Sequence, residues 1–352
     1  MSNINLFEPR SMLKVIERIN QPTTFLRDTF FRNVDVQQTN TIDVDFKKNG
    51  RKVAPFVHEK IGGVVIENTG FKTETFTPQL IAPSKITSAA DIATRSFGEG
   101  IYSSRTPAER AVEKLLRDFT ELDATISRRE EVMCSQALFG GKIEIINKDV
   151  NREINFHFTN DTALVGKDLW SDPSSKPYND LKNEVRRVQM TGSINPNIVV
   201  MGSDVADVFL NHAQIKEYMN LRHMNMGEFT PNIIAPGVTY LGRLNGLNLD
   251  IYEYNEYYLD DFTNPSSPEN KPLVPAGKVL IGSTEAQNTM AYAAITLLKE
   301  TPDGKGMYET YEATRVPDQW IERNPSRQMI QVNSKPLPVP NEIDSWSVLQ
   351  VL

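Results

Sequence analysis

The sequence predicts an α+β protein built around one very long helix. Three observations support this class. A continuous helical pattern covers residues 106–139, alternating polar and apolar residues predict strands on both sides of it, and helical and strand-like segments alternate over 177–298. At about 1.5 Å per residue the helix would be roughly 50 Å long. No compact domain requires that length, so we expect an elongated subunit with this helix as its spine.

The composition argues for an ordinary folded protein and against a dedicated nucleic-acid binder. The chain has 352 residues, 39% of them hydrophobic, and its net charge is −7. Residues 1–60 nevertheless carry ten Lys or Arg against seven Asp or Glu. This basic beginning on an acidic body fits head-to-tail contact between copies, but compositional scatter explains it equally well. No signal peptide or membrane-length apolar run is present, which favours a cytoplasmic site of synthesis and assembly.

The first third of the chain predicts an arm and a projecting loop. The apolar cluster FLRDTFF occupies residues 25–31. Residues 41–46 alternate polar and apolar, Asn49-Gly50 is a strong hairpin turn, and residues 51–57 would return as a second strand. An isolated two-stranded ribbon is marginal in water, so we expect this ribbon to pack on another subunit.

The long helix has clear signals at both ends. Thr106 and Glu109 form a capping box with a proline at the first helical position, and Gly140-Gly141 supplies the C-cap. Glu113 with Arg117, and Lys114 with Asp118, are favourable i, i+4 pairs that we place on the solvent side.

The remaining segments predict a series of shorter elements. Residues 177–191 and a segment beginning at 202–204 have helical patterns. The hydrophobic C-terminus, 345–352, is expected to be tucked in as a strand. The other predicted strands or extended segments cover residues 142–146, 154–158, 196–201, 238–258, 278–282, 308–315, 328–332 and 336–340, and residues 290–298 form a further apolar run.

No residue pattern points to catalysis, a cofactor or a metal. The four histidines lack metal-ligand spacing, and no P-loop or nucleophile-elbow motif occurs. His157 is interpreted as a strand residue, His212 as a helix end, and Cys134 as a small buried hydrophobe that has no disulfide partner. The adjacent acids Glu130-Glu131 and Asp260-Asp261 are interpreted as solvated faces. A metal-dependent hydrolase assembled from distant carboxylates stays open as an alternative.

Several longer motifs, in this order, resemble one family. The chain is similar to the lambda-type major head proteins (the protein E family) of tailed bacteriophages over nearly its whole length. None of these motifs is a catalytic signature. They are FLRDTFF (25–31), TNTIDVDF (39–46), RKVAPFV (51–57), TFTPQLIAP (75–83), RREEVMCSQALFGGK (128–142), NIVVMGSDVADVFL (197–210) and PDQWIERNPSRQMIQVNSKPLPVP (317–340).

The resemblance implies the tailed-phage major capsid fold and a division of the chain into five parts. These are an N-terminal arm (1–32), an extended loop (33–76), a peripheral domain (77–165) that contains the spine helix 106–139, an axial domain (166–299), and a return to the peripheral domain (300–352).

The resemblance also implies a function and partners. The subunit would assemble without enzymatic activity or cofactors into hexamers and pentamers of an icosahedral head, part of the virion, that encloses double-stranded DNA. A separate scaffold, a portal and a decoration protein would be its other partners, and no membrane is involved. A shell of a cellular nanocompartment with an enzyme cargo is the alternative. The candidate inter-subunit contacts are Phe25, Phe30, Phe31, Phe46, Lys47, Lys48, Arg51, Lys52, Phe56, Glu109 and Arg117.

Overall fold

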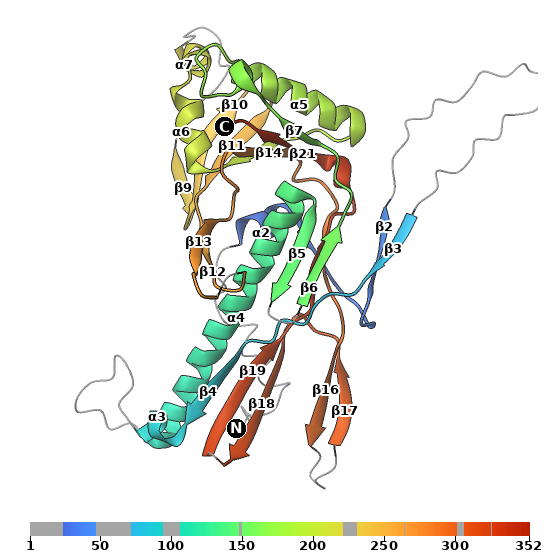
Figure 1. Ribbon diagram of the computed structural model, residues 1–352, viewed down its shortest axis with the longest axis vertical. Coiled ribbons are helices and arrows are strands. Elements are labelled where there is room, and N and C mark those ends of the chain that lie inside the picture. Colours follow the sequence, from blue (N-terminus) through green and yellow to red (C-terminus); the bar gives the residue numbers. More distant parts are fainter. Residues whose placement is uncertain are drawn as a thin grey trace, which may run out of the picture.

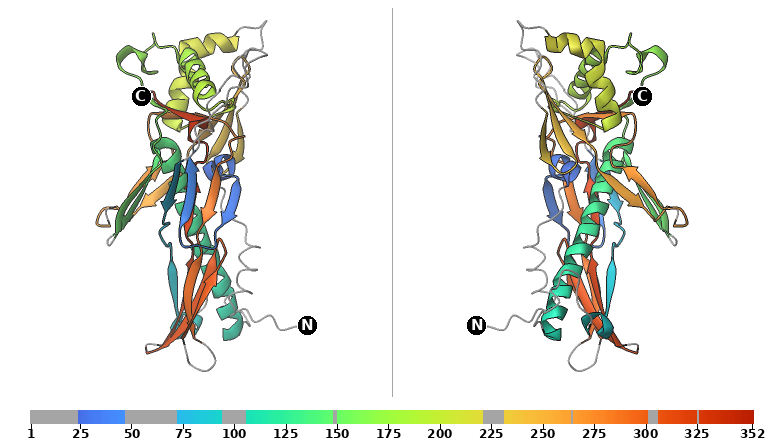
Figure 2. Two further views of the ribbon diagram at one scale, coloured as in Figure 1. Left: turned by 90° about the vertical axis from the view of Figure 1, so that its right-hand side faces the viewer. Right: turned by 90° about the vertical axis from the view of Figure 1, so that its left-hand side faces the viewer.

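The chain is elongated and is organised along one helix. A computed structural model describes residues 24–46, 72–93, 106–147, 150–220, 231–263, 265–300, 306–324 and 326–352. Helix α4 (Pro107–Gly140) runs from the lower end toward a lobe at the upper end (Figure 1). Figure 2 shows the same helix from both sides, with small sheets and ribbons beside it. No helix in these ranges is long and apolar enough to cross a membrane.

Helix α4 begins and ends at the predicted residues. The Thr106 Oγ1 atom accepts a hydrogen bond from the Glu109 amide at 3.3 Å, and the Thr106 amide donates to the Glu109 carboxylate at 2.8 Å. Gly141 follows the helix in the left-handed conformation at φ 64°, and its amide donates to the Ala137 carbonyl. The predicted spine helix and its capping box are therefore confirmed.

The upper lobe contains a seven-stranded sheet whose central strands are buried on both faces. Val199 and Met201 of strand β8 (Ile198–Met201) point to one face, and Ile198 and Val200 point to the other. Helices α5 (Pro177–Thr191), α6 (Ser203–Asn211) and α7 (Ala213–Asn220) cover the first face, and the upper part of α4 lies against the second. The strand order is β7 (Asp161–Ala163), β21 (Trp346–Gln350), β14 (Lys278–Gly282), β8 (Ile198–Met201), β11 (Leu249–Tyr254), β10 (Val238–Leu244) and β9 (Asn232–Ala235).

Small sheets and ribbons surround the lower part of α4. Strand β19 (Ser326–Asn333) lies between β18 (Val316–Arg323) and β4 (Ser84–Ser88), and its Ile330 and Val332 pack on the first half of α4. The other lower elements are helix α3 (Ala89–Ala93) and the ribbon β16 (Ile295–Glu300) with β17 (Gly306–Tyr311). Two further ribbons lie beside the upper half of α4, namely β5 (Lys142–Asn147) with β6 (Val150–Asn155), and β12 (Tyr257–Asp260) with β13 (Glu269–Pro272).

A central layer connects the two ends. Strand β15 (Thr289–Tyr292) pairs with β1 (Asn33–Val36) in parallel and with β20 (Pro336–Val339) in antiparallel orientation. Helix α2 (Phe25–Phe30) packs on α4 beside it. The remaining elements are β2 (Ile42–Phe46), β3 (Lys72–Phe76) and the 3-10 turns Gly166–Asp168 and Ile343–Ser345.

The C-terminal segment corrects one expected domain boundary. We expected residues 300–352 to complete the peripheral part, but strand β21 lies in the upper sheet between β14 and β7. Strand β7, at 161–163, belongs to the same sheet although it precedes residue 166. The reason is that β21 is buried along its length, so its backbone groups must be paired on both edges. Residues 316–333 do lie in the lower sheet, as expected.

The base of the predicted loop 33–76 belongs to the body of the subunit. Strand β1 lies in the central layer, and β2 pairs with β3, so Ile42 faces Phe76 across the ladder. Ile42 and Val44 are buried in the chain's own core. The predicted turn at 49–50 and the predicted strand at 51–57 lie outside the described residues.

Candidate functional site

The middle of α4 carries a buried cluster of charged residues. Glu130 and Glu131 are 0% and 2% exposed, so the expectation of a solvated acidic face is wrong for this pair. Asp260 is also buried, and its carboxylate accepts a hydrogen bond from Lys271 at 2.6 Å. A carboxylate is buried at this depth when cations and hydrogen-bond donors surround it, and those partners come from distant parts of the sequence.

Glu130 is enclosed by two arginines and a tyrosine. Arg315 donates from Nη1 to Oε1 at 2.7 Å and from Nη2 to Oε2 at 3.0 Å. Arg27 of α2 donates to Oε2 at 2.9 Å, and the Tyr292 hydroxyl of β15 donates to Oε1 at 3.0 Å. The Arg315 Nε atom also donates to Asp123 at 2.8 Å. These contacts connect α2, α4, β15 and the segment that leads into β18.

Glu131 holds the beginning of helix α2. Its carboxylate accepts hydrogen bonds from the amides of Leu26 at 2.7 Å and Arg27 at 3.1 Å, and from the Tyr254 hydroxyl at 2.9 Å. Thr24, at the N-cap of α2, makes no capping hydrogen bond, so this carboxylate replaces the usual cap and also favours the helix dipole. Burial raises the pKa of Glu131 to about 7, against the effect of these hydrogen bonds.

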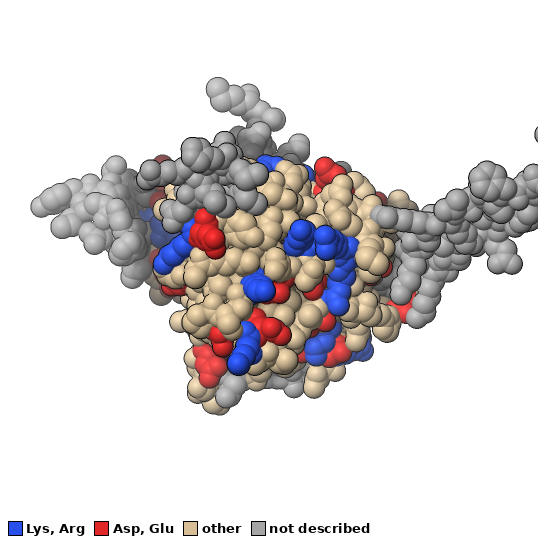
Figure 3. Space-filling model, turned by 90° about the horizontal axis from the view of Figure 1, so that it is seen from above, with Lys and Arg blue, Asp and Glu red and all other residues tan. Residues whose placement is uncertain are grey.

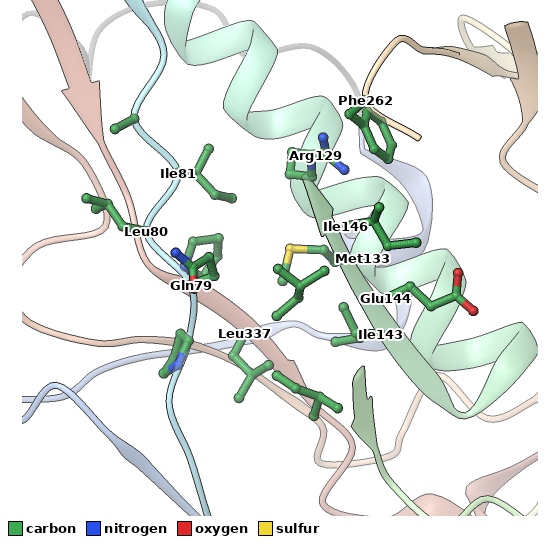
Figure 4. Close-up of a pocket in the computed structure, with 15 residues that line it drawn as sticks. Gln79, Leu80, Ile81, Arg129, Met133, Ile143, Glu144, Ile146, Phe262 and Leu337 are labelled. Atoms are coloured by element: carbon green, nitrogen blue, oxygen red, sulfur yellow. The ribbon is translucent and has the colours of Figure 1, made fainter. Parts of the chain in front are cut away.

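An apolar cavity of about 250 Å³ lies beside the cluster, between α4, the β5–β6 ribbon and residues 78–82 (Figure 4). Arg129 and Glu144 are the charged residues among those that line it. The Arg129 guanidinium lies 3.8 Å from the centre of the Phe262 ring, and the Glu144 carboxylate points away from the other labelled side chains. The described lining therefore brings no acid–base pair together in the cavity.

His157, His212 and Cys134, the described residues of these two types, have structural roles. His212 is buried at the junction of α6 and α7, where its ring accepts a hydrogen bond from the Gln214 amide and contacts Ser175. Cys134 is buried, as predicted. Strand β6 ends at Asn155 and His157 has φ 58°, so the predicted strand 154–158 is wrong for residues 156–158, because the Asn155 side chain accepts a hydrogen bond from the His157 amide and turns the backbone there. No group of three His, Cys, Asp or Glu suited to a metal occurs in the described ranges.

Phe30 and Phe31 of FLRDTFF do not offer a surface to a neighbouring copy. Phe30 and Phe31 are each 2% exposed within their own subunit, and Phe25 packs between Tyr252 and Tyr254 with ring centres 5.4 and 5.3 Å apart. This burial contradicts the expected inter-subunit contacts of Phe30 and Phe31, whereas Phe25 is half-buried and stays a candidate. The apolar cluster is instead the face with which α2 packs on the core of its own chain.

Two of the other predicted contact residues lie on the surface, and the rest lie outside the described part of the chain. Glu109 is exposed in the capping box, and Arg117 is exposed and paired with Glu113 at 3.7 Å. Asp118, which we placed on the solvent side, is buried and contacts Lys85 of β4 at 3.2 Å. The Phe46 side chain and the residues Lys47, Lys48, Arg51, Lys52 and Phe56 lie outside the described part of the chain.

Exposed apolar side chains on the lower ribbons were missed by the sequence analysis. Leu298 of β16 and Tyr308 of β17 are directly opposite each other and are 60% and 76% exposed. Trp320 and Ile321 of β18 are 38% and 75% exposed. The described part of the chain does not fully cover either face of β17 or of the outer part of β18. A strand pattern cannot reveal this condition because it predicts one buried face.

Comparison with known proteins shows the family to which this chain belongs. A family model described as phage major capsid protein E matches residues 8–351. The chain belongs to this family. A protein described as a capsid protein of a prophage from E. coli CFT073 superposes with a TM-score of 0.72 at 17% identity, covering 98% of this chain and 99% of the other. A phage-related protein from Bordetella bronchiseptica RB50 gives 0.56 at 12% identity, covering 98% and 97%. No curated protein sequence matches.

Membership in the capsid protein E family assigns the α+β fold and the role of a phage shell subunit. It favours the phage head over the nanocompartment shell. The buried charged cluster on α4 then stabilises the fold of a single shell subunit. The exposed apolar side chains of the lower ribbons are the candidate surfaces for contact between subunits.

Proposed function

We propose that this capsid protein assembles with copies of itself into hexamers and pentamers that close into an icosahedral head around double-stranded DNA. The assembly takes place in the host cytoplasm, needs no cofactor and includes no catalytic step. Many weak contacts, repeated around a closed shell, supply the free energy. A separate scaffold, a portal and a decoration protein are the further partners of this proposal.

The exposed apolar faces of the lower ribbons carry this proposal. A two-stranded ribbon is marginally stable alone, and contiguous exposed apolar surface commonly marks an interaction site. Leu298 and Tyr308 form such a face on β16–β17, and Trp320 and Ile321 are exposed on opposite faces of β18 in the neighbouring sheet (Figure 1). A second copy that covers these side chains would stabilise the ribbon and the outer end of the sheet.

Charged surface residues complete the proposed contacts. Glu109 and Arg117 lie on the exposed side of α4, and the lysines and arginines of residues 47–52 are further candidates. The net charge of −7 would keep enclosed DNA from binding tightly to the wall, so DNA is a partner by enclosure.

Assembly of the purified protein tests the proposal. We expect negative-stain microscopy and sedimentation velocity to show rings, tubes or shells for the natural chain. Tyr308→Glu, which places a charge on the apolar face, should reduce the assembled fraction, whereas Tyr308→Phe keeps that face and should assemble normally. A natural chain that remains monomeric under all conditions, or equal assembly of both variants, would contradict the proposal.

A further inference from the structure

Helix α5 presents a cationic stripe at one end of the upper sheet. Lys182, Arg186 and Met190 are spaced by four residues, so they form one row along the helix. All three are exposed, and Met190 is 79% exposed. Neither cation makes an ion pair with a described residue, whereas the neighbouring Arg187 contacts Glu184 at 3.3 Å. Seen from above, Lys and Arg side chains gather on the right, where Figure 1 places α5, with Asp and Glu among them (Figure 3).

Strand β9 forms the other end of the same sheet and carries the complementary groups. Ile233 of β9 is opposite Thr239 of β10, which is opposite Glu253 of β11. Residues opposite each other in a ladder face the same side, so Ile233 and Glu253 lie in one row. Ile233 is 76% exposed. Asp207 of α6 lies close to Glu253, and burial together with this second carboxylate raises the pKa of Glu253.

The two surfaces match in chemistry. The α5 stripe has two cations and an apolar side chain, and the β9 end has two carboxylates and an apolar side chain. Helix α5 packs on β14 and β21, so the two surfaces are at opposite ends of one sheet and cannot meet within a subunit.

We propose that Lys182, Arg186 and Met190 of one copy bind Asp207, Glu253 and Ile233 of the next. This is a head-to-tail contact, which closes into a ring when the rotation between copies is a whole fraction of a turn. Strand β9 is the last strand of this sheet among the described residues, and such an edge also favours contact with another chain. The inference rests on the proposed assembly function and names the surfaces that form the ring.

Charge reversal on one end tests the contact. Lys182→Glu with Arg186→Glu places like charges opposite each other, so the assembled fraction in sedimentation velocity should fall roughly tenfold or more. Adding Asp207→Lys and Glu253→Lys to the same chain restores opposite charges and should restore assembly. Circular dichroism and thermal unfolding check that each variant folds. Asp207→Lys alone, at an exposed residue, repeats the test without the half-buried Glu253.

Mixing two variants, each reversed at one end, gives a sharper result. The Lys182→Glu, Arg186→Glu variant is acidic at both ends, and an Asp207→Lys, Glu253→Lys variant is basic at both ends. Only a ring in which the two variants alternate therefore has opposite charges at every contact. The mixture should therefore form even-membered rings and lose five-membered ones, visible by negative-stain class averages. If the natural chain assembles and the Lys182→Glu, Arg186→Glu variant assembles equally well, this contact is wrong. If the natural chain itself does not assemble, the proposed function is wrong.

Discussion

Arg315 holds both carboxylate oxygens of Glu130, at 2.7 and 3.0 Å, from a position 185 residues further along the chain. Burial lowers the pKa of Arg315, but pairing with Glu130 outweighs it and the pKa is raised. The same guanidinium donates to Asp123. One planar cation thus compensates two buried carboxylates on α4, a geometry that the single ammonium of a lysine cannot reproduce.

Removing this cation should severely destabilise the subunit. Arg315→Met leaves Glu130 and Asp123 buried with much of their compensation gone, which costs about 3–5 kcal/mol. Urea unfolding followed by tryptophan fluorescence measures the loss, since Trp170 and Trp346 are buried. Arg327→Met, which breaks a half-exposed pair with Glu322 on the lower sheet, is the control and should cost far less. Equal losses in the two variants would contradict a special role for the cluster.

Glu131 should make stability depend on pH. Its pKa is about 7 in the folded chain and about 4.5 when unfolded, so between these values the folded state keeps a proton that the unfolded state has released. The free energy of unfolding should therefore fall as pH rises from about 4.5 to 7, by about 3 kcal/mol at most. The contribution is fully present below pH 4.5.

The variant Glu131→Gln isolates this effect. Glutamine does not titrate, so the difference in unfolding free energy between the natural chain and the variant should change across pH 4.5–7 and become constant above it. Urea unfolding at several pH values provides the comparison. A difference that stays constant over this range would mean that the carboxylate does not take up a proton on folding.

Two adjacent glycines at the end of α4 should respond oppositely to substitution. Gly141 has φ 64°, and a Cβ atom there would lie 2.2 Å from Phe158 Cβ, so Gly141→Ala should destabilise the fold by more than about 1 kcal/mol. At Gly140 the nearest atom to an added Cβ is Lys142 Cγ at 3.8 Å, so Gly140→Ala should be neutral or stabilising. Thermal unfolding of both variants is the measurement. A destabilised Gly140→Ala would show that crowding rather than conformation matters here.

The Cys134 thiol should be unreactive in the folded protein. It is completely buried, and burial, together with the nearby Glu131 and Glu130 carboxylates, raises its pKa. A thiol reagent should therefore label it slowly in native buffer and rapidly in denaturant, because the thiolate is the reacting form. The labelling rate in the Arg315→Met variant should increase in proportion to unfolding. Rapid native labelling would mean that the packing between α2 and α4 opens readily.

Local patterns in the sequence determined the elements of this protein. The capping box at Thr106, the glycines at 140–141 and the three- and four-residue apolar spacing predict α4 almost to the residue, because a helix is specified by contacts within one or two turns. The prediction of α5 over 177–191 is confirmed for the same reason. The ordered motifs along the chain also pointed to the correct family.

Only the tertiary structure decided which distant segments meet. Residues 25–31 are apolar whether they pack on their own α4 or on a neighbour, and Glu130 and Glu131 become buried only because Arg27, Arg315 and two tyrosines arrive from elsewhere. Strand β21 likewise could join either sheet until its ladder partners were known. The apolar pattern of a segment predicts that one of its faces is buried. Which surface covers that face depends on contacts between residues more than a hundred positions apart in the sequence. Such pairings leave no local signal in the sequence.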